Sequence, residues 1–92
     1  QGPPLVEVFD VRGAALPDKA YQVAFSLKNR TEEAQSVTIS LLDSKRVALM
    51  TRTIELTARA EGKPLKLDVP EVQPQALAVA CGTYRTNCVL SW

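Results

Sequence analysis

Two cysteines, Cys81 and Cys88, are the residues of this chain best suited to covalent chemistry. The chain contains no histidine, so it lacks the usual general base near neutral pH and the Ser-His and Cys-His nucleophile arrangements. The neighbouring carboxylates Glu32 and Glu33 lie in a polar stretch, where we expect water to solvate both. No Gly-rich phosphate loop or calcium-binding loop is present. The sequence therefore predicts a protein that is not an enzyme.

The spacing of the two cysteines favours a structural disulfide over redox or metal chemistry. Six residues separate Cys81 from Cys88, whereas redox-active pairs usually have two between them. Two thiolates supply half of a tetrahedral zinc site and no histidine completes it, so no metal or cofactor is expected. A disulfide would indicate an oxidising compartment, periplasmic or extracellular. The alternative is a pair of reduced thiols in the core of a cytosolic protein.

Hydrophobic patterning predicts how the cysteine-containing hairpin pairs. If the cysteines lie opposite each other, the neighbouring cross-strand pairs share one apolar face, and a slip by one residue would turn polar side chains inward. The pairs in this register are Cys81–Cys88, Val79–Leu90 and Leu77–Trp92. Cysteines directly opposite in antiparallel strands can have their β-carbons at disulfide distance. We therefore predict a disulfide between Cys81 and Cys88.

The charge of the chain is nearly balanced, with 11 basic and 10 acidic side chains interspersed along it. A nucleic-acid-binding protein concentrates Lys and Arg on one face, and a base-stacking platform needs more aromatic residues than the 5% present here. No apolar run approaches the ~20 residues that span a bilayer. We expect neither a nucleic-acid partner nor membrane insertion, and we expect a monomer.

Two polar features are candidates for contacts with other molecules. Asn29-Arg30-Thr31 is an N-glycosylation sequon, although a polar turn between strands is the favoured interpretation. A mildly basic strip along one sheet edge is the candidate binding edge. Its residues are Lys45, Arg46, Arg52 and Arg59. Such residues also commonly serve as a solvated face or as charges that keep an edge strand from aggregating.

Alternation of apolar and polar residues predicts strands over residues 5–11, 21–27, 37–42, 65–69, 77–81 and 88–92. Between Arg46 and Thr57 the alternation changes phase near Met50, which fits a bulged strand or two short strands better than a helix. The sequence predicts an all-β, immunoglobulin-like antiparallel β-sandwich of about seven strands, forming a single domain over residues 4–92. Gln1-Gly2-Pro3 matches the remnant of a viral 3C-protease tag site, so the natural segment is expected to begin near Pro4.

The alternating stretches 21–31 and 36–43 resemble the second and third strands of immunoglobulin-like modules, including the β-sandwich domains of transglutaminases. The chain is also similar to the CsgC family of small periplasmic curli accessory proteins. The similar features are the separation from Tyr21 to Val37-Thr38-Ile39, the segment 53–56 that leads to the Lys63-Pro64-Leu65 strand start, and the final strand that ends in Trp92. That family has a Cys-X-Cys where Gln35 and Ser36 stand here, so no redox role is carried over.

These resemblances and the missing catalytic groups predict an exported, non-catalytic interaction module. We expect it to bind a protein partner, including an unfolded or extended chain, through a sheet face or an edge strand. One alternative is a periplasmic curli-type chaperone that inhibits amyloid subunit assembly, as the CsgC resemblance implies. Another is a structural β-sandwich domain of a larger surface protein or enzyme.

Overall fold

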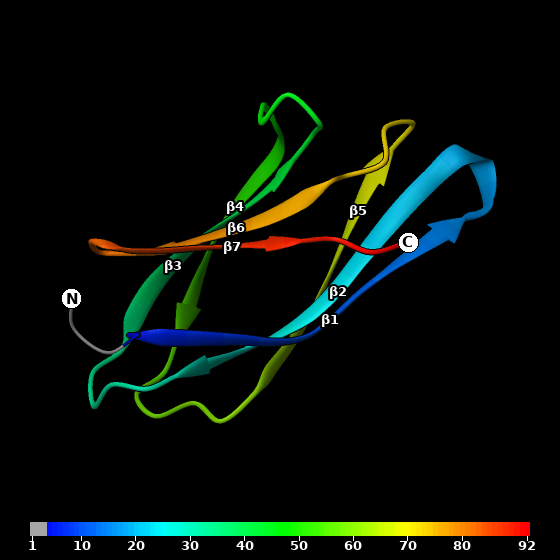
Figure 1. Cartoon of the computed structure of the whole chain (residues 1–92). Helices are drawn as coiled ribbons and strands as arrows, with labels where there is room; N and C mark the ends of the chain where they lie inside the picture. Colours follow the sequence, from blue (N-terminus) through cyan, green and yellow to red (C-terminus); the bar gives the residue numbers. More distant parts are fainter. Residues whose placement is uncertain (1–3) are drawn as a thin grey trace.

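Seven antiparallel strands form two facing sheets in the computed structural model, which describes residues 4–92 (Figure 1). The tag remnant suggested for residues 1–3 lies outside the described residues. The strands are β1 (Val6–Leu16), β2 (Ala20–Asn29), β3 (Gln35–Leu42), β4 (Ala48–Leu56), β5 (Lys63–Pro70), β6 (Ala76–Cys81) and β7 (Tyr84–Val89). The predicted all-β sandwich of about seven strands is confirmed.

The strand order is that of an immunoglobulin-like sandwich. One sheet has the order β1-β2-β5 and the other the order β4-β3-β6-β7. These orders correspond to strands A, B and E of the immunoglobulin fold facing strands C, F and G. The fourth strand pairs with β3, as the extra strand of variable-type domains does, and it therefore lies in the larger sheet.

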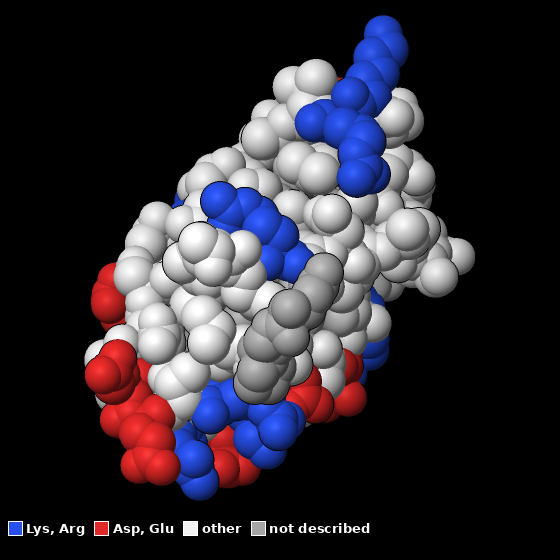
Figure 2. Space-filling model, turned by 60° about the vertical axis from the view of Figure 1, so that its left-hand side comes forward, with Lys and Arg blue, Asp and Glu red and all other residues white. Residues whose placement is uncertain are grey.

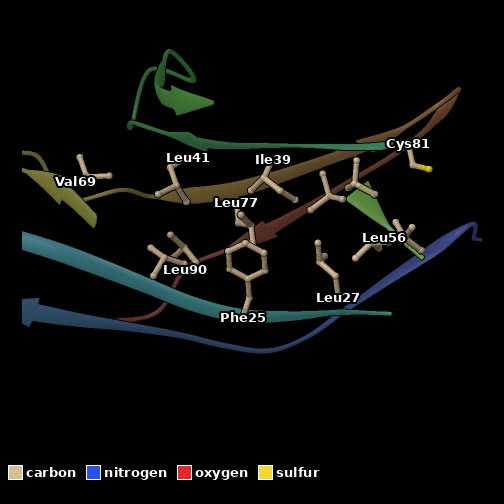
Figure 3. Close-up of a cluster of buried hydrophobic side chains, with 13 residues drawn as sticks. Phe25, Leu27, Ile39, Leu41, Leu56, Val69, Leu77, Cys81 and Leu90 are labelled. Atoms are coloured by element: carbon tan, nitrogen blue, oxygen red, sulfur yellow. The ribbon is translucent and has the colours of Figure 1, made fainter. Parts of the chain in front are cut away.

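The core lies between the two sheets and is built from the period-two pattern of the central strands. Val23, Phe25 and Leu27 of β2 point toward Ile39 and Leu41 of β3, and each is at most 2% exposed. Figure 3 shows the labelled side chains of the two layers meeting in the space between the sheets. Fully burying each such side chain contributes about 1.5 to 3 kcal/mol to folding.

Three strands differ from the prediction in extent or phase. The last of them, β7, covers Tyr84–Val89 where the sequence predicted a strand over residues 88–92. Residues 12–16, which lie beyond the strand predicted over residues 5–11, continue β1, and the turn that follows is the short 3-10 segment η1 (Pro17–Lys19). Residues 48–56 form the single strand β4, so the helical alternative is wrong. Its change of phase occurs at Leu49, the extra residue between the pairs Leu41–Met50 and Leu42–Ala48.

Trp92, which follows the last strand of the larger sheet, packs its side chain against residues of the smaller sheet. Its indole Nε1 donates a hydrogen bond to the Pro74 carbonyl at 2.8 Å, and its ring meets Tyr21 edge-on at 5.7 Å between centroids. The ring lies directly against the α-carbon of Gly13, where an added β-carbon would come within 2.6 Å of it. Glycine at position 13 therefore makes room for the tryptophan.

Asn29 connects the β2–β3 turn with the β4–β5 loop. The side chain is 1% exposed, and its Nδ2 donates to the carbonyls of Glu33 and Thr57 at 2.8 and 2.9 Å. Its Oδ1 accepts from the backbone N–H and the hydroxyl of Thr31 at 2.9 and 2.7 Å. Because both amide hydrogens are used inside the fold, the sequon is a structural turn, in agreement with the favoured interpretation of the sequence.

Candidate functional site

The hairpin of β6 and β7 has a different register from the predicted one. Cys81 pairs with Tyr84 and Leu77 pairs with Cys88, so the predicted pairs Cys81–Cys88, Val79–Leu90 and Leu77–Trp92 are wrong. The cause is the turn, which consists of two residues, Gly82-Thr83, with Gly82 at φ 60. Glycine at the first position of a two-residue loop is typical of a type II′ turn, which sets a tight register.

Both cysteines are free thiols in this register. Cys88 lies opposite Leu77, four residues along β6 from Cys81, which separates the two cysteines by roughly 13 Å at the rise of a β-strand. A disulfide requires α-carbons less than about 7 Å apart. The predicted disulfide is therefore absent, and the expectation of an oxidising compartment, which depended on it, loses that support.

The two thiols are expected to differ in reactivity. Cys81 is 1% exposed, its Sγ donates to Gln35 Oε1 at 3.5 Å, and burial raises the pKa of its thiol. Since the thiolate is the reacting form, an aromatic disulfide reagent should modify Cys88 first and Cys81 only as the protein unfolds. Thiol titration of the native protein without reductant should show one fast equivalent, and Cys88→Ser should remove it. Thiols that appear only after reduction would contradict this geometry.

The four basic residues of the candidate binding edge are spread along β4. Lys45 and Arg46 lie in the β3–β4 turn, Arg52 lies within β4, and Arg59 lies in the loop after it. The nine residues of β4 span about 30 Å, so the turn and the loop are at opposite ends of the strand. Arg59 forms an ion pair with Glu32 at 3.8 Å.

The Lys and Arg side chains do not form a continuous patch on the face seen in Figure 2. There the Lys and Arg side chains occur in separate groups with uncharged surface between them, and at the lower end they mix with Asp and Glu. Arg52 lies opposite Ile39 and hence on the core-facing side of an edge strand, with its guanidinium exposed. A charge in that position protects an edge against strand addition.

The other edge strands of the sandwich are β1 and β5 in the smaller sheet and β7 in the larger one. A bulge between Phe9 and Arg12 interrupts the pairing of β1 with β2, with Asp10 at φ 54. Pro64 and Pro70 remove two backbone donors from β5. Bulges and prolines, like the inward charge on β4, are features that prevent an edge from pairing with another chain.

The edge of β7 has none of these protective features. Its six residues include no proline and no register shift, and its one charged side chain, Arg85, lies on the outer face of the sheet, opposite Ala80. The N–H of Leu90 donates to the Gln75 carbonyl at 3.0 Å, so Leu90 and Gln75 form a hydrogen-bonded pair in the register of β6 and β7. Because hydrogen-bonded and non-hydrogen-bonded pairs alternate, Arg85, Asn87 and Val89 point their N–H and C=O groups away from β6. These three residues present unpaired backbone groups along the free edge.

The sequence prediction missed this edge because its last strand began at residue 88, which left residues 82–87 outside any predicted strand. The signal that could have found it is the dipeptide Gly82-Thr83, which begins with the residue a type II′ hairpin turn requires. The residues that the structure describes contain no cluster of His, Cys, Asp or Glu able to hold a metal ion. They also contain no helix long and apolar enough to cross a membrane.

The class of this protein is thus an antiparallel β-sandwich domain with sheets of three and four strands. No family model matches its sequence, and no curated protein matches it. Among solved structures, IrmA from Escherichia coli is similar, with a TM-score of 0.48 and 16% sequence identity. The alignment covers 97% of this chain and 91% of that chain.

Proposed function

We propose that this domain is a non-catalytic interaction module that binds an extended segment of a protein partner along the free edge of β7. The observation that carries the proposal is the outward orientation of the backbone groups of Arg85, Asn87 and Val89 on an edge without a proline, a bulge or an inward-facing charge. An extended peptide adds to such an edge through main-chain hydrogen bonds and extends the larger sheet by one strand.

The side chains next to the edge indicate what the partner segment contains. Val89 is 86% exposed, and it pairs with Ala76, which in turn pairs with Leu42 on the same outer face of the sheet. An apolar side chain of the partner would cover Val89 and continue this apolar row. Specificity in strand addition comes from alternate side chains of the added strand, so one such residue near Val89 sets its register.

Replacing Asn87 by proline should abolish binding without unfolding the domain. The N–H of Asn87 points away from β6, so Asn87→Pro removes a donor to the partner and leaves the hydrogen bonds of the hairpin in place. A random library of extended peptides provides the ligand, selected on the wild-type domain. We expect Asn87→Pro to weaken the selected peptide at least about tenfold, and Asn87→Ala, which keeps the N–H, to bind within about threefold of wild type.

Hydrogen exchange supplies the control for this experiment. In the free domain the amides of Arg85, Asn87 and Val89 should exchange fast, while those of Thr86 and Cys88 are protected, and bound peptide should protect the first set. Peptide binding that Asn87→Pro leaves unchanged, or that protects none of these amides, would refute the β7 edge. A domain that selects no peptide would instead fit a purely structural module of a larger protein.

A chaperone that delays amyloid assembly is a specific form of the same proposal. An unprotected edge pairs with the exposed strands of amyloid-forming subunits, and the resemblance to the CsgC family suggests that kind of client. The test is the lag time of curli subunit fibrils with the domain at substoichiometric concentration. The wild-type domain should lengthen the lag time and Asn87→Pro should not, and an unchanged lag time with the wild type excludes this form.

A further inference from the structure

A cavity of about 280 Å³ opens on the outer face of the smaller sheet, on the opposite side of the sandwich from the outer face that carries Val89. Its floor is formed by two small residues of the central strand β2, Ala24 and Ser26. Arg12 of β1 and Lys66 of β5 stand on either side, and Pro64 lies at one end. The volume is close to the lower limit for small-molecule sites.

The cavity exists because β1 is bulged at this point. Phe9 pairs with Ser26 and Arg12 pairs with Ala24, so Asp10 and Val11 together lie opposite a single residue of β2. Asp10 takes φ 54, in the left-handed region that aspartate adopts more readily than most residues. Bulges of this kind redirect the side chains beside them and occur often next to functional sites.

Strand register places the two cations symmetrically about Ala24. Arg12 pairs with Ala24 on one side, and Lys66 pairs with Ala24 on the other. Neighbouring strands are about 4.8 Å apart, so the backbones of Arg12 and Lys66 are about 10 Å apart with only a methyl group between them. An anion bound over Ala24 is therefore within reach of both side chains.

Neither cation is neutralised by an ion pair in the part of the chain that the structure describes. The nearby acids on this face have other partners, since Glu7 pairs with Arg30 at 2.9 Å and Asp68 accepts a hydrogen bond from Gln22 at 2.9 Å. Asp10 is the acidic residue of the cavity lining. Together with Arg12 and Lys66 it gives the lining a net charge of +1, which one negative charge balances.

We propose that this cavity binds a small monocarboxylate with a compact apolar group. The guanidinium of Arg12 matches a carboxylate through two parallel N–H bonds, and Lys66 supplies the second positive charge. The Ser26 hydroxyl offers a further donor, and Asp10 disfavours dianions. The methyl of Ala24 and the ring of Pro64 contact the apolar part of the ligand.

Titration of the ¹⁵N-labelled domain with sodium benzoate at constant ionic strength tests this site. We expect saturable shifts of the Ala24, Ser26 and Lys66 amides with a Kd in the millimolar range, as befits a ligand of this size in a half-open cavity. Arg12→Gln and Ala24→Leu, which fills the floor, should each weaken benzoate about tenfold or more. Lys45→Gln removes an exposed charge from the β3–β4 turn, which belongs to the other sheet, and should leave the affinity unchanged.

The outcomes that would overturn the proposal are specific to this cavity. They are shifts that fail to saturate, an affinity that Arg12→Gln and Lys45→Gln lower equally, and saturable binding of inorganic phosphate where benzoate gives none. Identical melting temperatures of Ala24→Leu and wild type ensure that a loss of binding reports the filled cavity. The site is separate from β7, so Asn87→Pro should bind benzoate like the wild type.

Discussion

Replacing Asn29 by alanine is expected to lower the free energy of unfolding by about 3 kcal/mol. The substitution removes all four hydrogen bonds of the Asn29 side chain and leaves the carbonyls of Glu33 and Thr57 without that donor. Each buried polar group left unpaired costs about 1 to 3 kcal/mol. A domain of this size has a total stability of roughly 5 to 14 kcal/mol, so the loss is a large fraction of it.

Urea denaturation measures this effect directly. The midpoint should fall by about 2 M, and the melting temperature by about 15 °C, with little change in the denaturant slope. The single tryptophan, Trp92, provides the fluorescence signal because it packs against Gly13 and Tyr21 in the folded state. A fall in midpoint of less than about 0.5 M would contradict the structural role of Asn29.

The isosteric substitution Asn29→Asp separates hydrogen bonding from shape. It puts a second oxygen where Nδ2 stands, 2.8 and 2.9 Å from the carbonyls of Glu33 and Thr57, so these atoms repel. Burial and repulsion raise the folded-state pKa of the new carboxyl above its unfolded value of about 3.9. The loss of stability relative to wild type should therefore be smallest below pH 4, where the carboxyl is protonated, and grow as the pH rises.

Ile39→Ala is expected to have an effect of similar size for a different reason, a cavity in the core. Ile39 is fully buried on β3, which pairs with β4 on one side and β6 on the other, so the surrounding backbone has little freedom to collapse around the missing atoms. Truncation of a buried isoleucine costs about 2 to 5 kcal/mol, and the central position places the expected loss at about 4 kcal/mol.

The neighbouring residue of the same strand is the matched control. Thr38 points to the outer face of the larger sheet, and Thr38→Ala should cost less than about 1 kcal/mol in the same urea experiment. If the two variants lost the same free energy of unfolding, Ile39 would be no more buried than Thr38, and this would contradict a core between the two sheets.

Several elements could be predicted from the sequence because they depend on local patterns. The alternation Tyr21–Leu27 produces the buried face of β2, and the change of phase near Met50 correctly favoured a bulged strand over a helix in β4. The hairpin of β6 and β7 shows the limit of that reasoning. A register shifted by four residues keeps the same side chains facing inward, so hydrophobic patterning alone does not distinguish the predicted pairing from the observed one.

For the candidate surfaces too, the sequence identified residue types, and the structure decided where they lie. Cys81 and Cys88 attracted attention by residue type, yet their separation depends on the turn at Gly82-Thr83. The basic residues Arg52 and Arg59 were identified by charge, although only the structure shows the first as an inward-side residue of an edge strand and the second in an ion pair with Glu32. The cavity beside Arg12 and Lys66 combines strands whose neighbours are set by sheet order, which no local pattern specifies.

The sequence by itself determined that this chain is an all-β domain of about seven strands that contains no histidine, because strand formation follows side-chain alternation and residue types are read directly. Only the tertiary structure decided the distance between the cysteines, the edge left open at β7 and the row Arg12–Ala24–Lys66. These features depend on strand register and sheet order. Both are set by turn geometry and by contacts between residues far apart in the chain, which outweigh local pattern wherever several registers bury the same face.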